Sequence, residues 1–159
     1  MAEVKIMIVD DEEIVHESIE DALEDEGYEF IDAFSGGEGI DLYNKHKPAL
    51  IILDLRMPKM NGLQFLEKLQ VKPEDPFSVI VLTGHGDAED MEKCYDLGIR
   101  TFLRKPFDIK ELRSLVESCI NLKKVETKLT SEVSKREDAE SELDDYRKEL
   151  NKMMESLKI

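Results

Sequence analysis

The sequence predicts an α/β protein in which a parallel β-sheet is covered by helices on both faces. Three observations lead to this fold class. Five short apolar runs alternate with amphipathic stretches over the first 121 of the 159 residues, which gives strands alternating with helices. Several runs are apolar throughout, as expected of parallel strands that are buried on both faces. All eight glycines and all five prolines, which punctuate turns, also lie in this part of the chain.

The predicted strands and helices follow one another in a regular order. The strands are expected at residues 4–9, 30–34, 49–53, 79–82 and 99–103. Each intervening segment carries apolar residues at helical spacing, and Ser35 stands where an N-cap of the second helix is expected. The apolar positions of the five helices are, in chain order, Ile14, Ile19, Ala22 and Leu23; Ile40 and Leu42; Leu63, Leu66 and Leu69; Met91, Cys94 and Leu97; Leu112, Leu115 and Val116.

Composition excludes several classes of protein. The net charge of −15 and the pI near 4.6 oppose direct binding to nucleic acid or to an anionic membrane surface. No apolar run is long enough to span a bilayer, and the N-terminus lacks a hydrophobic signal segment. The two cysteines are too few for a disulfide framework. We therefore expect a cytoplasmic protein that binds neither nucleic acid directly nor a membrane.

The C-terminal segment differs from the rest of the chain. Residues 122–159 contain no glycine or proline, and their 9 basic and 10 acidic residues nearly cancel. Such a segment predicts one uninterrupted helix. We place a domain boundary near Leu122, with a domain at 1–121 and a helix at 122–159 that continues from the fifth helix of the domain.

A seven-residue repeat runs along this helix. Arg136 interrupts a series of leucines spaced by seven, namely Leu115, Leu122, Leu129, Leu143, Leu150 and Leu157. Three residues after these positions come mostly apolar residues, Val125, Ala139, Tyr146 and Met153, with Ser118 and Glu132 as exceptions. The pattern predicts a coiled coil and therefore a homodimer through residues 122–157. The alternative is a single solvated helix held by pairs such as Glu149 and Lys152.

Polar residues follow four of the predicted strands. They are Asp10 and Asp11, Asp54, Thr83 and Lys105. Because the carboxyl ends of parallel strands meet at one edge of a sheet, these side chains are expected to converge. Crowded carboxylates need a cation, and oxygen ligands suit Mg²⁺ or Mn²⁺. An ammonium and a hydroxyl beside them suit phosphate, and an aspartate can itself accept a phosphoryl group.

Four segments carry a resemblance to a known family. They are residues 8–12 (Ile-Val-Asp-Asp-Glu), 53–62 (Leu-Asp-Leu-Arg-Met-Pro-Lys-Met-Asn-Gly), 81–86 (Val-Leu-Thr-Gly-His-Gly) and 102–107 (Phe-Leu-Arg-Lys-Pro-Phe). Over residues 4–121 the chain resembles the receiver domains of bacterial two-component response regulators. Residues 83–87 are most similar to receivers of nitrogen-regulation-type transcription activators. The resemblance implies the flavodoxin-like fold, a doubly wound parallel sheet with the strand order 2-1-3-4-5.

The resemblance also implies a role for each site residue. Asp54 is the expected phospho-acceptor, and the phosphoryl donor is a sensor histidine kinase or a phosphotransfer protein. Mg²⁺ is expected on Asp10, Asp11, Asp54 and the backbone carbonyl of Arg56. Thr83 and Lys105 are expected to contact the phosphoryl oxygens. Thr83 and Phe102 are the expected switch residues, acting on the face of the fourth helix, fifth strand and fifth helix and on the attached dimeric helix. The Lys105-Pro106 bond is expected to be cis.

Other interpretations of these residues remain open at this point. The acidic run at 10–13 is also what a helix start favours, Thr83 can cap the following helix, and Phe102 can be an ordinary core aromatic. The three histidines are expected at the surface, and Cys94 and Cys119 are expected to be buried thiols.

Other functions also remain open. One alternative is a metal-dependent phosphatase with an aspartyl nucleophile, although Arg56 stands where such phosphatases carry a second acid. A flavin carrier is disfavoured because four acidic residues would repel flavin phosphate. A third alternative is a receiver-like dimerisation module that is never phosphorylated. We expect no enzymatic activity apart from assistance to the protein's own phosphorylation and dephosphorylation. The chain is expected to be either a stand-alone regulator or a fragment joined to a sensory or catalytic output domain, and we favour the fragment.

Overall fold

The computed structural model describes residues 3–157. The chain divides into two compact units after Lys123. The first unit is built on a five-stranded parallel sheet in the order β2-β1-β3-β4-β5, which confirms the predicted fold class and strand order. The strands are β1 (Lys5–Val9), β2 (Glu29–Ala33), β3 (Leu50–Asp54), β4 (Ser78–Thr83) and β5 (Thr101–Arg104).

Helices alternate with these strands as the sequence predicts. They are α1 (Glu13–Ala22), α2 (Gly36–His46), α3 (Gly62–Leu69), α4 (Ala88–Asp96) and α5 (Ile109–Ser156), with a 3₁₀ turn, η1, at Glu24–Glu26. Ser35 caps α2 by accepting a hydrogen bond of 3.1 Å from the Glu38 amide. Asn61 and Gln64 form a reciprocal capping box at the start of α3. Thr83 is not a cap, because α4 begins after Asp87.

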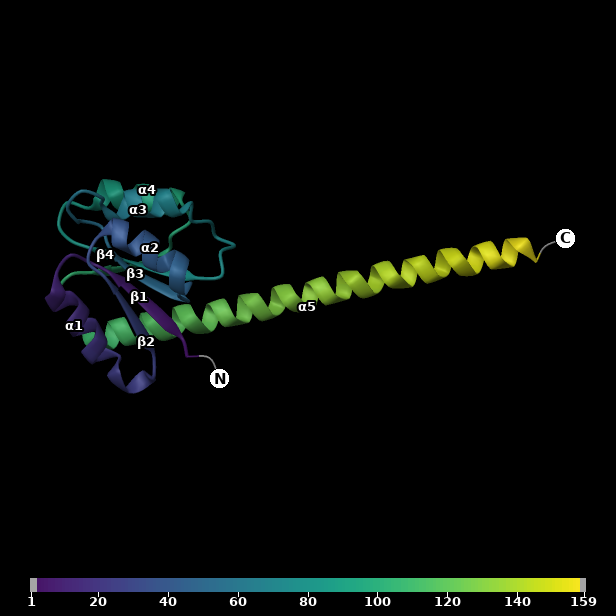
Figure 1. Ribbon diagram of the computed structural model, residues 1–159, viewed down its shortest axis with the longest axis horizontal. Coiled ribbons are helices and arrows are strands. Elements are labelled where there is room, and N and C mark those ends of the chain that lie inside the picture. The colour runs from purple at the N-terminus through teal and green to yellow at the C-terminus, as the bar shows by residue number, and fades with distance from the viewer. Residues whose placement is uncertain (1–2, 158–159) are drawn as a thin grey trace. The chain divides into compact units, whose positions relative to one another are not determined.

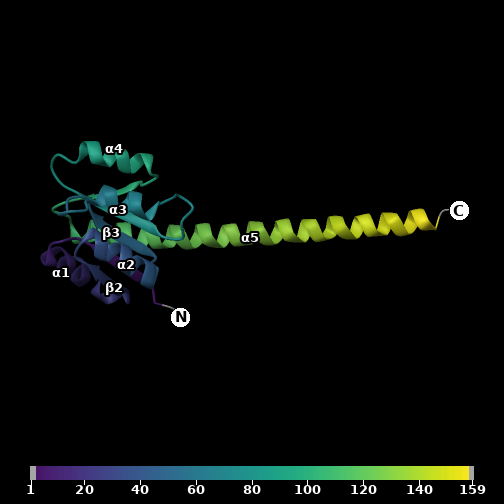
Figure 2. The same cartoon turned by 45° about the horizontal axis from the view of Figure 1, so that its top comes forward.

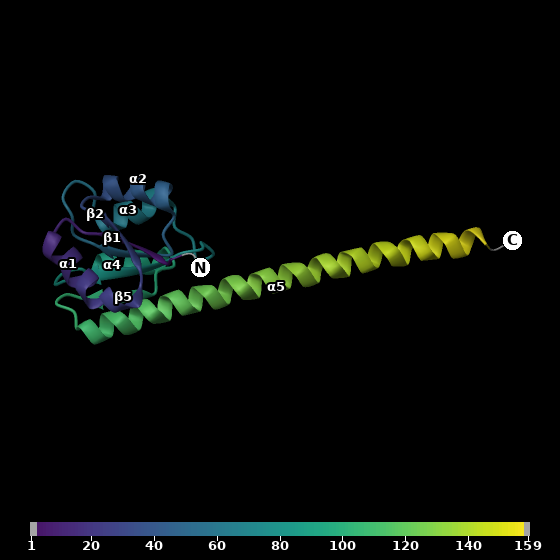
Figure 3. The ribbon, with the colours of Figure 1, turned by 60° about the horizontal axis from the view of Figure 1, so that its bottom comes forward.

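Two hydrophobic layers cover the two faces of the sheet. Alternate strand residues such as Met7 and Val9 pack with α2, α3 and α4, whereas Ile6 and Ile8 pack with α1 and the first part of α5. Figure 1 shows the same division of the helices between the two faces. Helices α2 and α3 lie side by side in every view (Figures 1, 2 and 3). The three central strands β1, β3 and β4 are almost entirely buried, and their carboxyl ends lie at one edge of the sheet.

The buried face of α1 differs from the predicted one. Val15, His16, Ile19 and Ala22 are buried, whereas Ile14 is 63% exposed. The predictions that Ile14 belongs to the core stripe and that His16 lies at the surface are therefore wrong. His16 points inward because its ring forms hydrogen bonds there with Asp32 and with the backbone oxygen of Asp10.

Helix α5 confirms the uninterrupted C-terminal helix as far as Ser156, and residues 158–159 lie outside the described part of the chain. Its apolar residues beyond the domain are exposed, including Leu129 at 60%, Leu143 at 51% and Leu150 at 58%. Within residues 3–157, no helix combines the length and apolar composition that crossing a membrane requires. The coiled coil remains a prediction.

Candidate functional site

Three carboxylates meet at the carboxyl edge of the sheet. Asp10 follows β1, Asp11 comes next in the chain, and Asp54 ends the neighbouring strand β3. One oxygen from each lies within 4.8 Å of the others. Asp10 and Asp54 are buried, with 0% and 6% exposure, and Asp11 is open to solvent. The burial of Asp10 shows that the acidic run is more than a helix start.

Lys105 supplies the positive charge of this edge. Its Nζ donates to Oδ2 of Asp10 at 3.0 Å and lies 3.4 Å from Oδ1 of Asp54. The backbone fixes its place, because the Lys105 amide donates to the Thr83 carbonyl at 2.8 Å beyond the β4–β5 pairing. The Lys105-Pro106 bond is cis, as expected. The structure therefore brings four of the predicted site residues into one cluster.

The cluster is electrostatically strained without a further cation. Burial, and then repulsion by Asp10, raises the pKa of Asp54 to about 6, although Lys105 and the Arg56 amide partly oppose the change. Burial disfavours the charge of Lys105, but its hydrogen bond to Asp10 and the two carboxylates outweigh burial and raise its pKa. A site whose carboxylates repel one another, and whose ligands are all oxygens, fits Mg²⁺.

The two predicted switch residues line one pocket. Thr83 is buried at the end of β4, and Phe102 is half-buried on β5. Both border a pocket of about 430 Å³ that also touches Met91 of α4 and Glu111 of α5. The Phe102 ring stacks on Tyr95 with 5.3 Å between centroids. Phe102 is thus packed on α4 but beside free space.

Asp87 is a site residue that the sequence analysis missed. Its carboxylate is 2% exposed and accepts from Nε of Arg56 at 2.5 Å and from the Gly84 amide at 2.6 Å. Arg56 also donates to the His85 carbonyl at 3.2 Å. These bonds tie the loop after Asp54 to the loop after Thr83. In the sequence, the features that could have indicated this pair are the arginine two positions after Asp54 and the aspartate four positions after Thr83.

His16 and Asp32 were also missed. The His16 ring is buried between Asp32 of β2 and the backbone of Asp10. Of the other histidines, His46 is half-buried and His85 is exposed. Cys94 and Cys119 are buried, as predicted.

Sequence comparison identifies the family to which this site belongs. The family model of the response regulator receiver domain matches residues 6–117. The chain belongs to the response regulator receiver family. This membership confirms the expected family and places the domain in phosphorylation-based, two-component signalling.

Known receivers match the chain over different shares of their length. Sporulation initiation phosphotransferase F of Bacillus subtilis is 34% identical over 119 residues, which are 75% of this chain and 95% of that protein. Response regulator Rre1 of Synechocystis sp. is 36% identical over 146 residues, covering 90% of this chain and 63% of that protein. The crystal structure of NtrX from Brucella abortus is similar with a TM-score of 0.73 at 26% identity, over 82% of this chain and 29% of that one. The chain thus spans less than two thirds of the last two.

Proposed function

We propose that Asp54 accepts a phosphoryl group from a histidine kinase or a phosphotransfer protein. The observation that carries this proposal is the joint approach of Asp10 and Asp54 to the Lys105 ammonium, at 3.0 and 3.4 Å. An electron-rich carboxylate beside a fixed ammonium and two further carboxylates suits transfer of a phosphoryl group. Family membership supports the same role.

Asp10, Asp11, Asp54 and the backbone carbonyl of Arg56 are the proposed ligands of Mg²⁺. The fit rests on three carboxylate oxygens within 4.8 Å and on the raised pKa of Asp54, which comes from burial and then from repulsion by Asp10. When bound, Mg²⁺ neutralises negative charge that would otherwise keep the phosphoryl group and the carboxylate apart. The remaining contributions come from the protein's own side chains.

In the transfer step, an oxygen of Asp54 attacks the phosphorus of a phosphohistidine. The new P–O bond forms as the P–N bond breaks, and the electron pair of that bond stays on the donor imidazole. Lys105 pairs with one oxygen of the transferred group, and the hydroxyl of Thr83 donates to another. The product is an acyl phosphate on Asp54, which adds up to two negative charges and three acceptor oxygens to the edge.

The switch follows from the move of Thr83 toward the phosphoryl group. This move changes the pocket that Thr83 shares with Phe102, whose ring then turns into the space vacated. The face of α4, β5 and α5 changes shape with it, as a shift between two packings. The Arg56–Asp87 bond lies between the two loops involved and opposes this move until Asp54 is phosphorylated.

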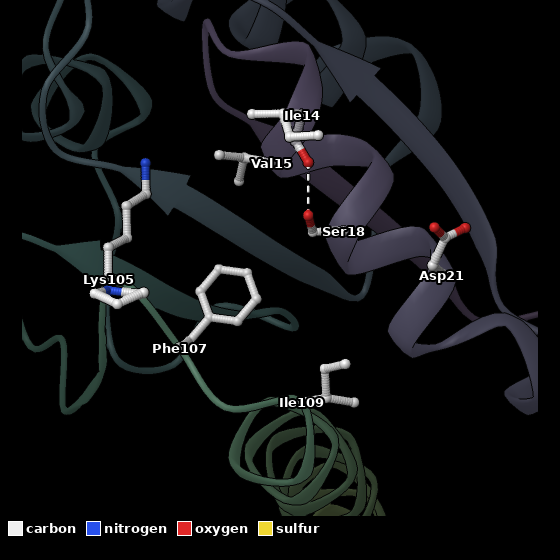
Figure 4. A pocket seen from close by; sticks show the side chains of 8 residues that line it. Ile14, Val15, Ser18, Asp21, Lys105, Phe107 and Ile109 are labelled. Carbon is white, nitrogen blue, oxygen red and sulfur yellow. Dashed lines mark hydrogen bonds between the residues drawn. The ribbon is translucent and has the colours of Figure 1, made fainter.

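The phosphoryl donor needs a docking surface beside Asp54. A pocket of about 650 Å³ lies between α1 and the start of α5, and Lys105 stands at its border. Figure 4 shows the Phe107 ring between α1 and the first turn of α5, facing Ile14 and Val15. Ile14 and Ile109 are 63% and 54% exposed. We propose that this apolar pocket receives the donor protein.

Signal output is proposed to pass through the C-terminal helix. The domain at 1–121 carries the switch, and residues 122–157 form a parallel homodimeric coiled coil. The exposed leucine series along α5 supports this assignment, because a lone helix would leave these side chains in water.

Phosphorylation by acetyl phosphate tests the proposed function. Incubation of the full chain with Mg²⁺ should add one phosphoryl group of about 80 Da (PO₃H) by intact mass, consistent with one acceptor site. Asp54→Asn should abolish the addition, whereas Asp96→Asn, an exposed carboxylate on α4, should not. Undiminished labelling of Asp54→Asn, or labelling that persists in excess chelator, would refute the proposal. Continuous release of phosphate from p-nitrophenyl phosphate would instead support the phosphatase alternative.

A further inference from the structure

A buried histidine lies beneath the carboxylate edge. The His16 side chain is 3% exposed, and the Phe34 ring lies against its ring at a tilt of 31°, with 4.3 Å between centroids. Nδ1 lies 2.6 Å from Oδ1 of Asp32, and Nε2 lies 2.7 Å from the backbone oxygen of Asp10. A backbone carbonyl oxygen can only accept a hydrogen bond, so Nε2 is the donor to Asp10. The ring is therefore fixed at both ends.

All four polar atoms of Asp10 are engaged. Its amide donates to the Ala33 carbonyl at 3.1 Å, and its carbonyl accepts from His16. Oδ1 accepts from the Glu12 amide at 2.9 Å, and Oδ2 accepts from Lys105. The bond to Ala33 holds the Asp10 amide to β2, the bond from Glu12 is local, and the bond from Lys105 is an ion pair. The bond from His16 holds the Asp10 carbonyl and links it to α1.

We propose that His16, oriented by Asp32, is a positioning residue for Mg²⁺ binding: it fixes the Asp10 peptide and thereby the direction of the Asp10 and Asp11 carboxylates. This inference rests on the proposed Mg²⁺ site at Asp10, Asp11 and Asp54. It concerns how the ligands are held, since the His16 side chain itself points to a backbone oxygen and not to the acidic cluster.

The physical reason is that metal ligands must be held in place before the ion arrives. The Asp10–Asp11 peptide lies where β1 ends and α1 has not yet begun, so neither element's ladder restrains its carbonyl. Groups that orient metal ligands without touching the metal commonly change metal affinity by about 10- to 100-fold. Removing the bond to Asp10 should therefore weaken Mg²⁺ binding while leaving the phosphoryl chemistry possible at saturating Mg²⁺.

Two amide variants test separately the contacts made by the two ring nitrogens of His16. In Gln the amide nitrogen reaches the place of Nε2, whereas in Asn it reaches only the place of Nδ1. His16→Gln should therefore keep the bond to Asp10, and His16→Asn should keep only the contact with Asp32. Calorimetric titration of the full chain with Mg²⁺ should show affinity weakened about 10-fold or more in His16→Asn and His16→Ala. His16→Gln should retain most of the affinity.

A metal-free measurement and a stability control complete the test. In chelator, the Glu12 amide, which donates to Asp10, should exchange its hydrogen faster in His16→Asn than in the wild type. Val116→Ala removes buried side-chain volume from the core layer that includes α1, and it should lower stability without changing Mg²⁺ affinity.

Each outcome bears on the inference. Wild-type Mg²⁺ affinity in folded His16→Asn and His16→Ala overturns it, and so does an equal loss of affinity in Val116→Ala. In either case a wild-type chain that binds Mg²⁺ and is phosphorylated at Asp54 leaves the proposed function intact. A wild-type chain that binds no Mg²⁺ overturns both.

Discussion

Lys105 donates from Nζ to Oδ2 of Asp10 at 3.0 Å across 95 positions of sequence, and it has Asp54 as its second partner at 3.4 Å. The ammonium thus bridges a proposed metal ligand and the proposed acceptor. In the proposed mechanism the same ammonium pairs with a phosphoryl oxygen after transfer, so we expect Lys105 to help convert phosphorylation into movement.

Lys105→Ala is expected to separate phosphorylation from the conformational response. The two carboxylates lose their neighbouring cation, so their repulsion grows and Mg²⁺ binding is retained or strengthened. The variant should accept phosphate from acetyl phosphate, yet the amides of residues 83–87 and 102–104 should change little in hydrogen exchange. A normal phosphorylation-dependent change in these segments would contradict the bridging role.

Asp54→Asn is expected to stabilise the metal-free domain at neutral pH. The folded-state pKa of about 6 exceeds the ordinary 3.8, so the folded state binds this proton more tightly than the unfolded chain. The stability that the group provides is present below pH 3.8 and is lost as the pH rises through about 6. Asparagine avoids that loss, for a gain of about 1–3 kcal/mol by urea unfolding at pH 7.5.

Mg²⁺ provides the internal control for that measurement. The ion stabilises the wild-type domain by binding the folded state. Added Mg²⁺ should therefore reduce the difference in free energy of unfolding between the wild type and Asp54→Asn. Asp96→Asn, which removes an exposed carboxylate, should behave as the wild type in chelator. An Asp54→Asn variant that is no more stable than the wild type in chelator would contradict the raised pKa that burial and repulsion by Asp10 give to Asp54.

Much of this architecture is predictable because buried parallel strands are recorded in the sequence as continuous apolar runs. The first four observed strands agree with the predicted runs to within one residue at each end, and β5 begins two residues later than predicted. Parallel strands end at a common edge. The convergence of Asp10, Asp54 and Lys105 therefore follows from their positions, with Asp54 at the end of β3 and Asp10 and Lys105 directly after β1 and β5. Glycine at 62 also has a structural reason, because a Cβ there would lie 2.5 Å from the Asp54 carbonyl oxygen.

The polar network around His16 and Asp87 was not predictable in the same way. The prediction of the buried helix face relied on the spacing of apolar residues. It therefore placed Ile14 in the core and the polar His16 at the surface. The burial of His16 depends on Asp32, sixteen positions away on an edge strand, and on a backbone carbonyl that has no side-chain signature. Asp87 likewise finds Arg56 31 positions earlier. Partners of this kind become apparent only when the chain is folded.

The Arg56–Asp87 pair is expected to restrain the loop that follows Thr83. Asp87 is buried, so Arg56→Met leaves its carboxylate without the guanidinium and loosens its bond to the Gly84 amide. The Gly84 amide should then exchange faster in the unphosphorylated domain. Asp87→Asn should act in the same direction, and the double variant should add little, as expected for residues that contact each other. Additive effects would show that the pair does not act as a unit.

Glu20 is expected to make folding stability depend on pH near neutrality. Burial, followed by hydrogen bonding to Asp32 and its negative charge, raises the pKa of Glu20 to about 7. A raised folded-state pKa means that this contribution to stability is present below pH 4.5 and is lost as the pH rises through about 7. Glu20→Gln should therefore flatten the decline in stability between pH 5 and 8, measured by urea unfolding. Glu17→Gln, on the exposed side of α1, controls for the loss of one acid, and an unchanged decline in Glu20→Gln would contradict the assignment.

The seam along α5 is expected to hold two chains together. Leu122, Leu129, Leu143 and Leu150 are each more than half exposed in a single chain, and burying one leucine contributes roughly 1.5–3 kcal/mol. This gain exceeds the modest destabilisation from Arg136 and Glu132 at the same seam. The full chain should therefore sediment as a dimer at tens of micromolar. Even a modest association free energy gives a dissociation constant of roughly that concentration or lower. Removal of residues 122–159 should give a monomer that is still phosphorylated.

Single substitutions distinguish the seam from a solvated helix. Leu143→Asp places a charge in the seam and should yield a monomer, whereas Asn151→Asp adds the same charge one position after Leu150 and should leave the dimer intact. Tyr146→Cys tests the parallel arrangement, since two in-register helices bring residue 146 of each chain together and form a disulfide on oxidation. The native thiols do not interfere, because Cys94 and Cys119 are buried. A dimer that does not cross-link at 146 would contradict the parallel register, and a monomeric intact chain would contradict the coiled coil and leave α5 a lone solvated helix.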